Sequence, residues 1–368
     1  MKVLLTATVQ SHICQFHKPL VEVLHSHGYE VHVAARNNLA EKNGLKLDFV
    51  DKIFNVPFAR SPKSKENLCA YKELKKIIEK EQYEVIHCNT PMGGIVTRLA
   101  ARNARKRGTK VYYTAHGFHF YKGAPKKNWI VFYPIEKLFS RITDKLITIT
   151  QEDYELASHK FYCKVERIHG VGVDEDKFCI TSSENSIIKE EYQGKIIVLC
   201  IGELNKNKNQ ITVIKAIQKL REKYPQILLL LAGNGPEEIW LKEQVREMQL
   251  EGHVEFLGYR TDLEKFVNLC YIVVSASKRE GLPMNIMEAM ICGKPVVASE
   301  NRGHKELVIN NKTGFLVPFW DEIAFEKKIE KLITDNLVWK EFSLNAKSRS
   351  VLYNSKGVKK ELEKVYME

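Results

Sequence analysis

Two glutamates, Glu280 and Glu288, lie on either side of a sequence that predicts a turn followed by a helix. Pro283 marks the helix start, since the missing N–H of proline costs nothing in a first helical turn. The backbone N–H groups of Leu282 to Asn285 then form a positive helix end suited to a diphosphate. Glu280 falls in the loop and Glu288 within the helix, so one carboxylate can accept hydrogen bonds from a hexose and the other from ribose hydroxyls. The alternative is a solvated surface acid at 280 and a helix salt bridge at 288.

The elements that must position these residues alternate between strand-like and helix-like runs. In the first half, the strand-like runs are residues 3–9, 30–34, 85–87, 110–114 and 145–149, and the amphipathic runs are 16–27, 72–80 and 94–103. The second half repeats the pattern, with strand-like runs at 195–199, 226–232, 254–256, 272–275 and 295–298, and helical runs at 210–223, 239–249, 262–269 and 283–292. This order predicts an α/β protein with parallel sheets covered by helices on both faces.

The length of 368 residues indicates two domains, each with its own core. The chain turns polar over residues 181–194, which we interpret as a linker between a domain at 1–180 and a domain at 195–350. A polar helix at 351–368 could pack across either domain. Two such domains in tandem imply a ligand between them, because doubly wound sheets bind ligands beyond the carboxyl ends of their strands.

The run from Glu280 to Glu288, followed by Gly293-Lys294-Pro295-Val296-Val297, resembles the E-x7-E motif of family 4 glycosyltransferases. The resemblance covers nearly the whole chain. It implies the GT-B fold, with two Rossmann-like domains facing a cleft, and a retaining, metal-independent transfer from a nucleotide-sugar. It also implies that Glu280 contacts the donor sugar and Glu288 the ribose, with Gly281, Leu282, Pro283, Met284 and Asn285 forming the donor loop.

Other segments match the same family in order. Gly202 opens the loop that binds the diphosphate in the family, and Lys208 aligns with the family lysine. An ammonium near the sugar-bearing phosphate is useful because charge develops there as the glycosidic bond breaks. Glu203 replaces the usual arginine, and we expect Lys206 or Arg279 to compensate. The resemblance also assigns donor contacts to the turn and base segments that contain Asn234, Gly235 and Arg260.

In the first domain, His116 matches a family histidine that contacts hydroxyl groups of the donor sugar. The alternative is a structural histidine that holds its turn. Residues 8–12 replace the usual glycine-rich acceptor loop, so the acceptor side is assigned only to His12, His119 and Lys122. The segment from His116 to Pro125, with the aromatic residues that follow it, is similar to the capsule and exopolysaccharide branch of the family. Those aromatics and lysines suit an anionic membrane interface, with burial in the core as the rival interpretation.

The composition limits the kinds of binding partner that we expect for this chain. The formal charge of +12 fits nucleic acid, an anionic membrane or a phosphorylated substrate. Because the chain lacks a nucleic-acid-binding motif, we expect no nucleic acid as a partner. We favour an acceptor sugar that is linked to a polyprenyl diphosphate lipid. The scattered cysteines read as core thiols rather than as disulfides or zinc ligands. The short Asp174-Glu175-Asp176 run is not assigned a metal, and no cofactor is expected.

We therefore expect a retaining hexosyltransferase of cell-surface polysaccharide synthesis, with a UDP-sugar favoured as donor. The longest apolar runs are far shorter than the roughly 20 residues of a membrane helix. The start of the chain reads as a buried strand rather than a signal peptide, so we expect a cytoplasmic protein at the inner face of the plasma membrane. Two alternatives remain: a sugar-nucleotide 2-epimerase and a non-catalytic sugar-nucleotide-binding protein.

Overall fold

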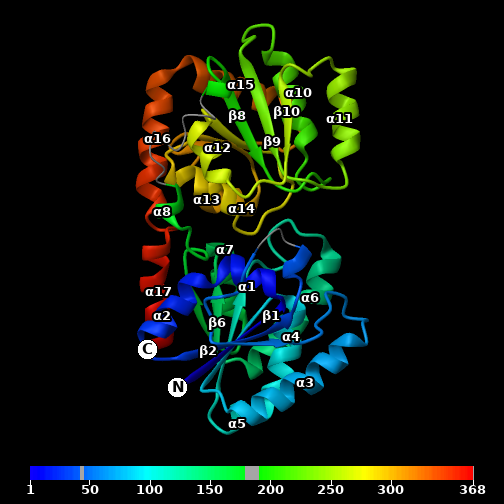
Figure 1. Ribbon diagram of the computed structural model, residues 1–368, viewed down its shortest axis with the longest axis vertical. Coiled ribbons are helices and arrows are strands. Elements are labelled where there is room, and N and C mark those ends of the chain that lie inside the picture. Colours follow the sequence, from blue (N-terminus) through cyan, green and yellow to red (C-terminus); the bar gives the residue numbers. More distant parts are fainter. Residues whose placement is uncertain (42–44, 179–189, 368) are drawn as a thin grey trace. The chain divides into compact units, whose positions relative to one another are not determined.

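The computed structural model describes residues 1–41, 45–178 and 190–367. The chain divides into two compact units (Figure 1). The first unit contains Met1–Gly172 together with Ser355–Glu368, and the second contains Val173–Asn354. Most of the predicted linker at 181–194 lies outside the described residues. Residues 173–178, expected in the first domain, belong to the second unit, where the backbone carbonyl of Phe178 accepts a hydrogen bond from Asn268 at 2.9 Å.

The first unit is built on a seven-stranded parallel sheet of order β3-β2-β1-β4-β5-β6-β7. Its strands are β1 (Lys2–Val9), β2 (Glu30–Arg36), β3 (Lys52–Asn55), β4 (Val85–Asn89), β5 (Lys110–Ala115), β6 (Lys145–Thr148) and β7 (Lys164–Arg167). Its helices are α1 (Gln10–Phe16), α2 (Lys18–Ser26), α3 (Glu66–Glu81), α4 (Pro91–Ala100), α5 (Arg102–Lys106), α6 (Lys126–Phe139), α7 (Gln151–Lys160) and α17 (Ser355–Met367), with short 3-10 turns at Leu39–Glu41 and Ser140–Ile142. β1 is central because it pairs with both β2 and β4, and it is buried along almost its whole length.

The second unit has a six-stranded parallel sheet of order β10-β9-β8-β11-β12-β13. Its strands are β8 (Ile196–Ile201), β9 (Ile227–Ala232), β10 (Val254–Gly258), β11 (Ile272–Ser275), β12 (Val296–Ser299) and β13 (Gly314–Val317). Its helices are α8 (Glu175–Phe178), α10 (Gln210–Leu220), α11 (Glu238–Glu247), α12 (Leu263–Leu269), α13 (Met284–Ile291), α14 (Arg302–Leu307), α15 (Glu322–Thr334) and α16 (Asn336–Ser350).

Both faces of the second sheet are covered by apolar residues of the helices. Val198 and Leu229 pack with α10, α11 and α15 on one face, while Leu199 and Leu230 pack with α12 and α13 on the other. Strands buried on both faces need nearly continuous apolar runs, which is why β8 and β9 consist almost entirely of Ile, Leu and Val.

The single helix expected at residues 16–27 is two helices. α1 starts at Gln10, directly after β1, and α2 starts at Lys18, so His17 lies at the break between them. Pro19 explains the break, because it cannot donate a backbone hydrogen bond and is tolerated only in the first turn of a helix. The restart turns His17 into the protein, where it is 4% exposed.

The C-terminal helix α17 belongs to the first unit. Lys359 of α17 forms an ion pair with Glu22 of α2 at 2.5 Å, and Glu361 accepts from His169 at 2.6 Å. The hydroxyl of Tyr366 contacts Nδ1 of His87 in β4. Polar groups of this helix therefore have specific partners in α2, in β4 and at His169, shortly after β7.

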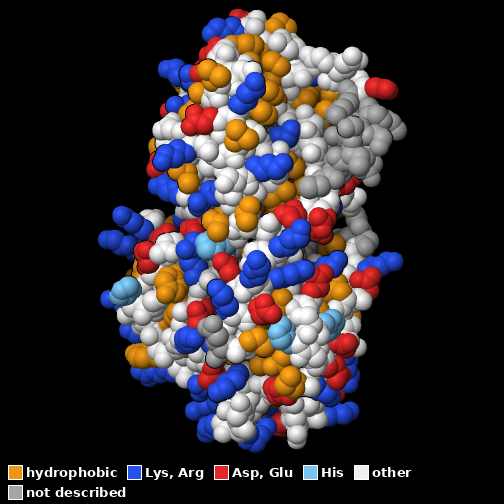
Figure 2. Space-filling model, turned by 90° about the vertical axis from the view of Figure 1, so that its left-hand side faces the viewer, with side chains coloured by type: hydrophobic (Ala, Val, Ile, Leu, Met, Phe, Trp, Pro, Cys, Tyr) orange, Lys and Arg blue, Asp and Glu red, His pale blue; other side chains and the backbone are white. Residues whose placement is uncertain are grey.

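Two arginines that contribute to the positive charge are paired within the protein. Arg98 is 1% exposed and forms an ion pair with Glu136 at 3.0 Å. Arg105 is paired with Asp144 at 2.9 Å. Elsewhere, basic and acidic side chains are interspersed on the face drawn in Figure 2, so the positive charge there is not one continuous patch.

The cysteines also differ in part from the expectation of core thiols. Cys88, Cys200 and Cys270 are buried, whereas Cys69 is exposed on α3. Cys179 lies outside the described residues, and the seven cysteines that the structure describes are all free thiols.

The Arg98–Glu136 pair ties α4 to α6. The guanidinium also donates to the carbonyl of Gly94 at 3.0 Å and lies over the ring of Tyr113, 4.1 Å from its centroid. We expect Arg98→Met to lower the free energy of unfolding by about 3–5 kcal/mol, because it leaves the Glu136 carboxylate buried without its cation. Chemical denaturation of the full chain measures the loss, and Arg102→Met, at an exposed position of α5, is the matched control. Equal midpoints for the two variants would contradict this account of the pair.

Candidate functional site

The order of strands in the second unit reverses between β8 and β11, which are neighbours in the sheet. Sequence neighbours β8 and β9 lie to one side of this point, and β11 and β12 lie to the other. In open α/β sheets, ligands bind beyond the carboxyl ends of the strands at such a reversal. The two loops that leave this position are residues 202–209 after β8 and residues 276–283 after β11, and they contain Lys208 and Glu280.

Lys208 and Glu280 form an ion pair across these two loops. The Lys208 Nζ to Glu280 Oε1 distance is 2.6 Å, and the side chains are 23% and 13% exposed. Gly202 packs closely against the stem of this lysine. Its φ is +153°, and a Cβ at this position would lie 3.2 Å from Cε of Lys208. A side chain at 202 would therefore strain the backbone and require the lysine stem to shift by a few tenths of an ångström.

The loop that carries Lys208 is held by its own polar side chains. The Asn205 side-chain oxygen accepts hydrogen bonds from the backbone N–H groups of Asn207 and Lys208, at 3.0 and 2.9 Å. Asn207 in turn donates its side-chain amide to the carbonyl of Arg279 at 3.0 Å, and its own carbonyl accepts from the N–H of Lys278 at 2.7 Å. The lysine is thus fixed in place relative to the loop that carries Glu280.

The turn after β9 also packs against this loop. The backbone carbonyl of Asn234 accepts from the N–H of Leu204 at 3.0 Å. A Cβ on Gly235 would lie 2.3 Å from the Leu204 carbonyl oxygen, so only glycine fits there. Asn234 and Gly235, predicted as donor contacts, therefore support the loop that carries Lys208.

Helix α13 begins at Met284, with Pro283 in an extended conformation as its N-cap. Its first turn contains no acidic residue, and Pro283 offers no capping side chain. Asn285 does not extend its amide towards a ligand: Nδ2 donates to the Ile201 carbonyl at 2.8 Å, and Oδ1 accepts from the N–H of Ile286 at 3.0 Å. This residue therefore fastens the start of α13 to the end of β8.

Glu288 lies in the middle of α13 and is partly buried. Burial raises the pKa of its carboxyl to about 7, an effect that the nearby Lys177 opposes and Glu264 reinforces. A carboxyl whose ionisation is this unfavourable in the free protein gains from any ligand that donates hydrogen bonds to it.

Arg260, another predicted donor contact, is occupied within the protein. Its guanidinium makes a two-pronged contact with Asp262, at 2.9 and 2.8 Å, and lies 5.0 Å from the ring centroid of Phe266. Its remaining N–H groups are the ones available to a base.

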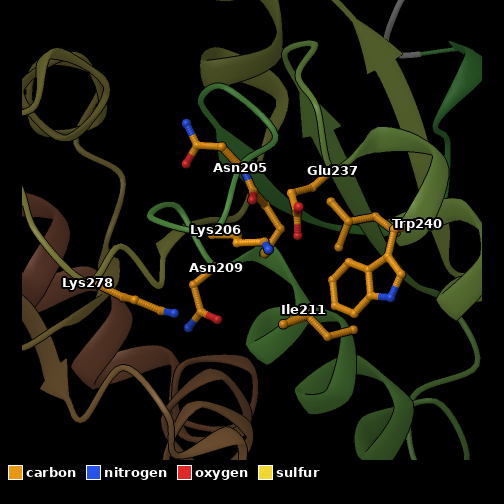
Figure 3. Close-up of a pocket in the computed structure, with 9 residues that line it drawn as sticks. Asn205, Lys206, Asn209, Ile211, Glu237, Trp240 and Lys278 are labelled. Carbon is orange, nitrogen blue, oxygen red and sulfur yellow. The ribbon is translucent and has the colours of Figure 1, made fainter.

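Glu203, which replaces the usual arginine of the family, is exposed. The carboxylate of Glu203 accepts from the Asn205 amide at 2.9 Å. Of the two proposed substitutes, Arg279 is exposed and Lys206 lines a pocket of about 370 Å³ between the Lys208 loop, α10 and α11 (Figure 3). Trp240 and Glu237 line the same pocket, whereas Lys208, Glu280 and Glu288 do not. The pocket thus lies beside the candidate site and does not coincide with it.

His304 is a residue that sequence reasoning missed. It lies on α14 and is fully buried. Its Nδ1 donates to the Ser299 carbonyl at 2.7 Å, so Nε2 of the neutral ring is an acceptor, and it has no hydrogen-bond partner among the described residues. Burial lowers the pKa of His304 to about 4; the hydrogen bond to Ser299 and the charge of Glu280 oppose this effect, and the charge of Lys208 adds to it. A histidine shortly after a buried strand was the available signal.

In the first unit the order of strands reverses between β1 and β4. His116, directly after β5, and His12, on α1 after β1, meet there with an Nε2 to Nε2 distance of 3.2 Å. His116 also lies 3.3 Å from the side-chain oxygen of Asn89 at the end of β4. Burial lowers the pKa of His116 to about 4, so this group is a neutral hydrogen-bonding residue at pH 7.

The other predicted acceptor residues lie further along the same segment. His119 stacks on Phe132 of α6, with centroids 4.7 Å apart, and Lys122 is exposed, with its backbone N–H donating to Glu152 at 2.6 Å. Phe118 and Phe120 are buried, so the core interpretation holds for these two aromatics. The Asp174 side chain accepts from the backbone N–H of Asp176 at 3.1 Å, which gives it a role in the turn into α8.

Comparisons with known proteins agree with this architecture. The family model described as glycosyl transferase 4-like matches residues 2–150, and the one described as glycosyl transferases group 1 matches residues 182–349. A putative glycosyltransferase, EpsD of Bacillus subtilis, is 41% identical over 337 residues, which are 90% of this chain and 87% of the relative. A UDP-Gal:alpha-D-GlcNAc-diphosphoundecaprenol alpha-1,3-galactosyltransferase of Escherichia coli is 27% identical over 89% of this chain and 87% of its own.

Solved structures with the same fold include Anabaena HepE in complex with UDP, which superimposes with a TM-score of 0.81 at 21% identity and covers 100% of both chains. Sucrose-phosphate synthase of Thermosynechococcus elongatus gives a TM-score of 0.80 at 20% identity, covering 100% of this chain and 98% of that one. The predicted GT-B fold is thereby confirmed.

The raised pKa of Glu288 predicts a stability that falls as the pH rises. The unfolded carboxyl titrates near 4.5 and the folded one near 7, so between these values the folded protein holds the extra proton. Above about pH 7 the full penalty is present, and below about pH 4.5 it disappears. We expect Glu288→Gln to raise the free energy of unfolding by about 2 kcal/mol at pH 8, allowing for the partial exposure of the group, and by progressively less towards pH 5. Urea unfolding of both proteins across this range measures the difference, with the exposed Glu300→Gln as control; a pH-independent difference would refute the assignment.

Proposed function

Because this chain belongs to the family 4 glycosyltransferases and has their GT-B fold, we propose that it is a retaining hexosyltransferase that uses a UDP-sugar and a polyprenyl-diphosphate-linked acceptor. The observation that carries the proposal is the Lys208–Glu280 ion pair at the strand reversal of the second unit. A cation and a carboxylate held within one hydrogen bond of each other can serve the two parts of a sugar-phosphate: the leaving phosphate and the hydroxyl groups of the sugar.

In the proposed donor complex, the diphosphate lies at the N-terminus of α13, where backbone N–H groups and the helix dipole favour negative charge. Lys208 exchanges its contact with Glu280 for the phosphate that carries the sugar, which frees the Glu280 carboxylate to accept from hexose hydroxyls. Glu288 accepts from the ribose hydroxyls, and this contact favours its ionised form. His116 contacts the donor sugar, as the family resemblance implies.

The chemistry follows from this charge distribution. An acceptor hydroxyl attacks the anomeric carbon on the face that the nucleotide leaves, the bond to the phosphate breaks, and a phosphate oxygen takes the proton of the hydroxyl. Lys208 and the start of α13 stabilise the negative charge that grows on the leaving diphosphate. Because these groups supply positive charge where a metal ion would otherwise be needed, we propose a metal-independent transfer.

The choice of substrates is supported by relatives. HepE was solved with UDP and with UDP-glucose, and the Escherichia coli relative is named for a UDP-sugar donor and a diphosphoundecaprenol acceptor. The similarity to EpsD supports a role in exopolysaccharide or capsule synthesis. With a lipid-linked acceptor, we propose that the reaction takes place at the cytoplasmic face of the plasma membrane.

The ion pair predicts that Glu280→Gln abolishes transfer but keeps nucleotide binding, because the sugar loses its carboxylate while the diphosphate site remains. We expect a fall in kcat of at least about a hundredfold, comparable to the loss of one transition-state contact. Transfer from UDP-sugars to a diphosphate-linked glycolipid measures it, and calorimetry with UDP, GDP and dTDP identifies the nucleotide.

Glu300→Gln is the matched control, since Glu300 is exposed and pairs with Lys305 outside the site. Wild-type turnover by Glu280→Gln would refute the role of the ion pair. Isomerised donor sugar in the absence of acceptor would indicate an epimerase instead, and tight UDP binding with no turnover on any acceptor would indicate a non-catalytic protein.

Contact with the membrane is proposed through α6. Its exposed side combines Ile130, Val131 and Leu138, which are 74%, 49% and 58% exposed, with Lys126 and Lys127 in the first turn. The opposite side is anchored by the buried Glu136. An apolar strip beside lysines is suited to the headgroup region of an anionic bilayer. Within the described residues, no helix has the length and apolar content needed to cross one.

We expect the double change Ile130→Glu and Leu138→Glu to weaken binding to vesicles containing anionic lipid by at least about tenfold, because each residue loses apolar burial in the interface. Co-sedimentation with vesicles of phosphatidylglycerol and phosphatidylcholine measures the change. Leu68→Glu, at a 66% exposed position of α3, is the control. Equal binding by all three proteins would exclude this surface.

A further inference from the structure

Three histidines converge beyond the carboxyl ends of the strands in the first unit. His12 lies on α1, His17 at the break before α2, and His116 directly after β5. One ring nitrogen from each lies within 4.8 Å of the other two. All three belong to the same compact unit, so their arrangement depends on the fold of that unit alone.

The distances approach those of a tetrahedral metal site. Zinc binds imidazole nitrogens at about 2.0–2.1 Å, which places two nitrogens of a tetrahedral site about 3.3 Å apart. The Nε2 atoms of His12 and His116 are already 3.2 Å apart. His17 has to approach by about 1.5 Å at most, a movement within reach of a ring rotation.

His17 is the strongest sign that the cluster is incomplete without a ligand. Its side chain is 4% exposed, and Nε2 has no hydrogen-bond partner among the described residues. A buried polar nitrogen without a partner is rare and costly in folded proteins. A bound ion would give this nitrogen the partner that the surrounding residues do not supply.

In the free protein, Asn89 is a hydrogen-bond partner of His116. The Asn89 amide donates to the Thr6 carbonyl at 3.2 Å, so its oxygen accepts from Nε2 of His116 at 3.3 Å. A metal ion bound at this Nε2 takes the place of that proton, and the neutral ring then carries its proton on Nδ1. His87, the fourth histidine nearby, is different: its two nitrogens are occupied by Thr114, at 2.7 Å, and Tyr366. The His87 ring therefore packs beside the cluster and is not counted among its metal-binding residues.

The protonation state agrees with metal binding. Burial lowers the pKa of His12 and His17 well below the ordinary value, and each is lowered further by the neighbouring rings. Neutral imidazoles are the form that coordinates metals, whereas they hold an anion poorly. The cluster itself consists of nitrogen donors, which favour zinc over magnesium or manganese.

We propose that His12, His17 and His116 bind one zinc ion, with water as the fourth ligand, and that the bound ion inhibits sugar transfer by removing His116 from the donor sugar. The inhibitory part rests on the function proposed for His116, whereas the metal site rests on the geometry of the three rings. Zinc here is a regulator that opposes a metal-independent reaction.

Binding is tested first, with a readout independent of activity. Tag-free full-length protein is titrated with Zn²⁺ by calorimetry and with Co²⁺ by visible absorption, which reports tetrahedral coordination. We expect one site per chain. His12→Gln, His17→Gln and His116→Gln should each lower the zinc affinity at least about tenfold, since the loss of a residue that only hydrogen-bonds to a metal ligand already costs that much. His159→Gln, at an exposed position of α7, is the matched control.

The absence of a single site, or unchanged affinity in the three variants, overturns the metal site. Thermal melting shows which variants are folded; because His17 is buried, His12→Gln decides the result if His17→Gln does not fold.

Inhibition is tested next, as the activity of each protein with added Zn²⁺ relative to its own activity with EDTA. Wild type should be inhibited and His17→Gln should resist. Zinc that binds without inhibiting overturns the regulatory part alone, and a wild-type protein that binds zinc but never transfers sugar contradicts the proposed function and not the site.

Discussion

The second unit depends on one constraint, the reversal of strand order between β8 and β11. Crossover helices leave the sheet in opposite directions from that point, so the loops after the two strands stand side by side with open space beyond them. Lys208 and Glu280, 72 positions apart in the chain, meet there at 2.6 Å. The surrounding polar contacts maintain this meeting: Asn205 holds the lysine loop, and Asn285 ties α13 to the end of β8. The topology of the sheet therefore brings together the residues of the proposed donor site.

The first unit has the same kind of reversal, between β1 and β4, but a different chemistry at its edge. There the converging groups are histidines and an asparagine, and burial keeps the rings neutral. Burial also governs the opposite effect at Glu288, where it raises the pKa of an acid. In both cases burial disfavours the charged form of the side chain in the free protein, so a ligand that supplies hydrogen bonds or a charge would offset this cost.

The central strands and most of the helices that form the site could be predicted from apolar runs, while β3, β7 and β13 were missed. All three are four-residue strands at the edge of a sheet. β3 is largely exposed and β7 is only partly buried, and neither has the continuous apolar run that marks a buried strand. β13 is mostly buried but begins with glycine and is too short to show a period. The break at His17 was also missed, because the apolar pattern continues through it and only Pro19 marks the restart.

By itself, the sequence determined the fold class and the family, and it predicted the donor motif, because these follow from local order: apolar runs, turn residues and the spacing of Glu280 and Glu288. Only the tertiary structure decided which polar groups are available. It showed Arg98 paired in the core, Arg260 engaged by Asp262 and Lys208 joined to Glu280. It also showed that His304 and His17 each have a buried nitrogen without a hydrogen-bond partner among the described residues. The physical reason is that burial and pairing are set by residues distant in the chain. A sequence records each residue's charge, whereas its partner and its desolvation appear only when the strands are placed side by side.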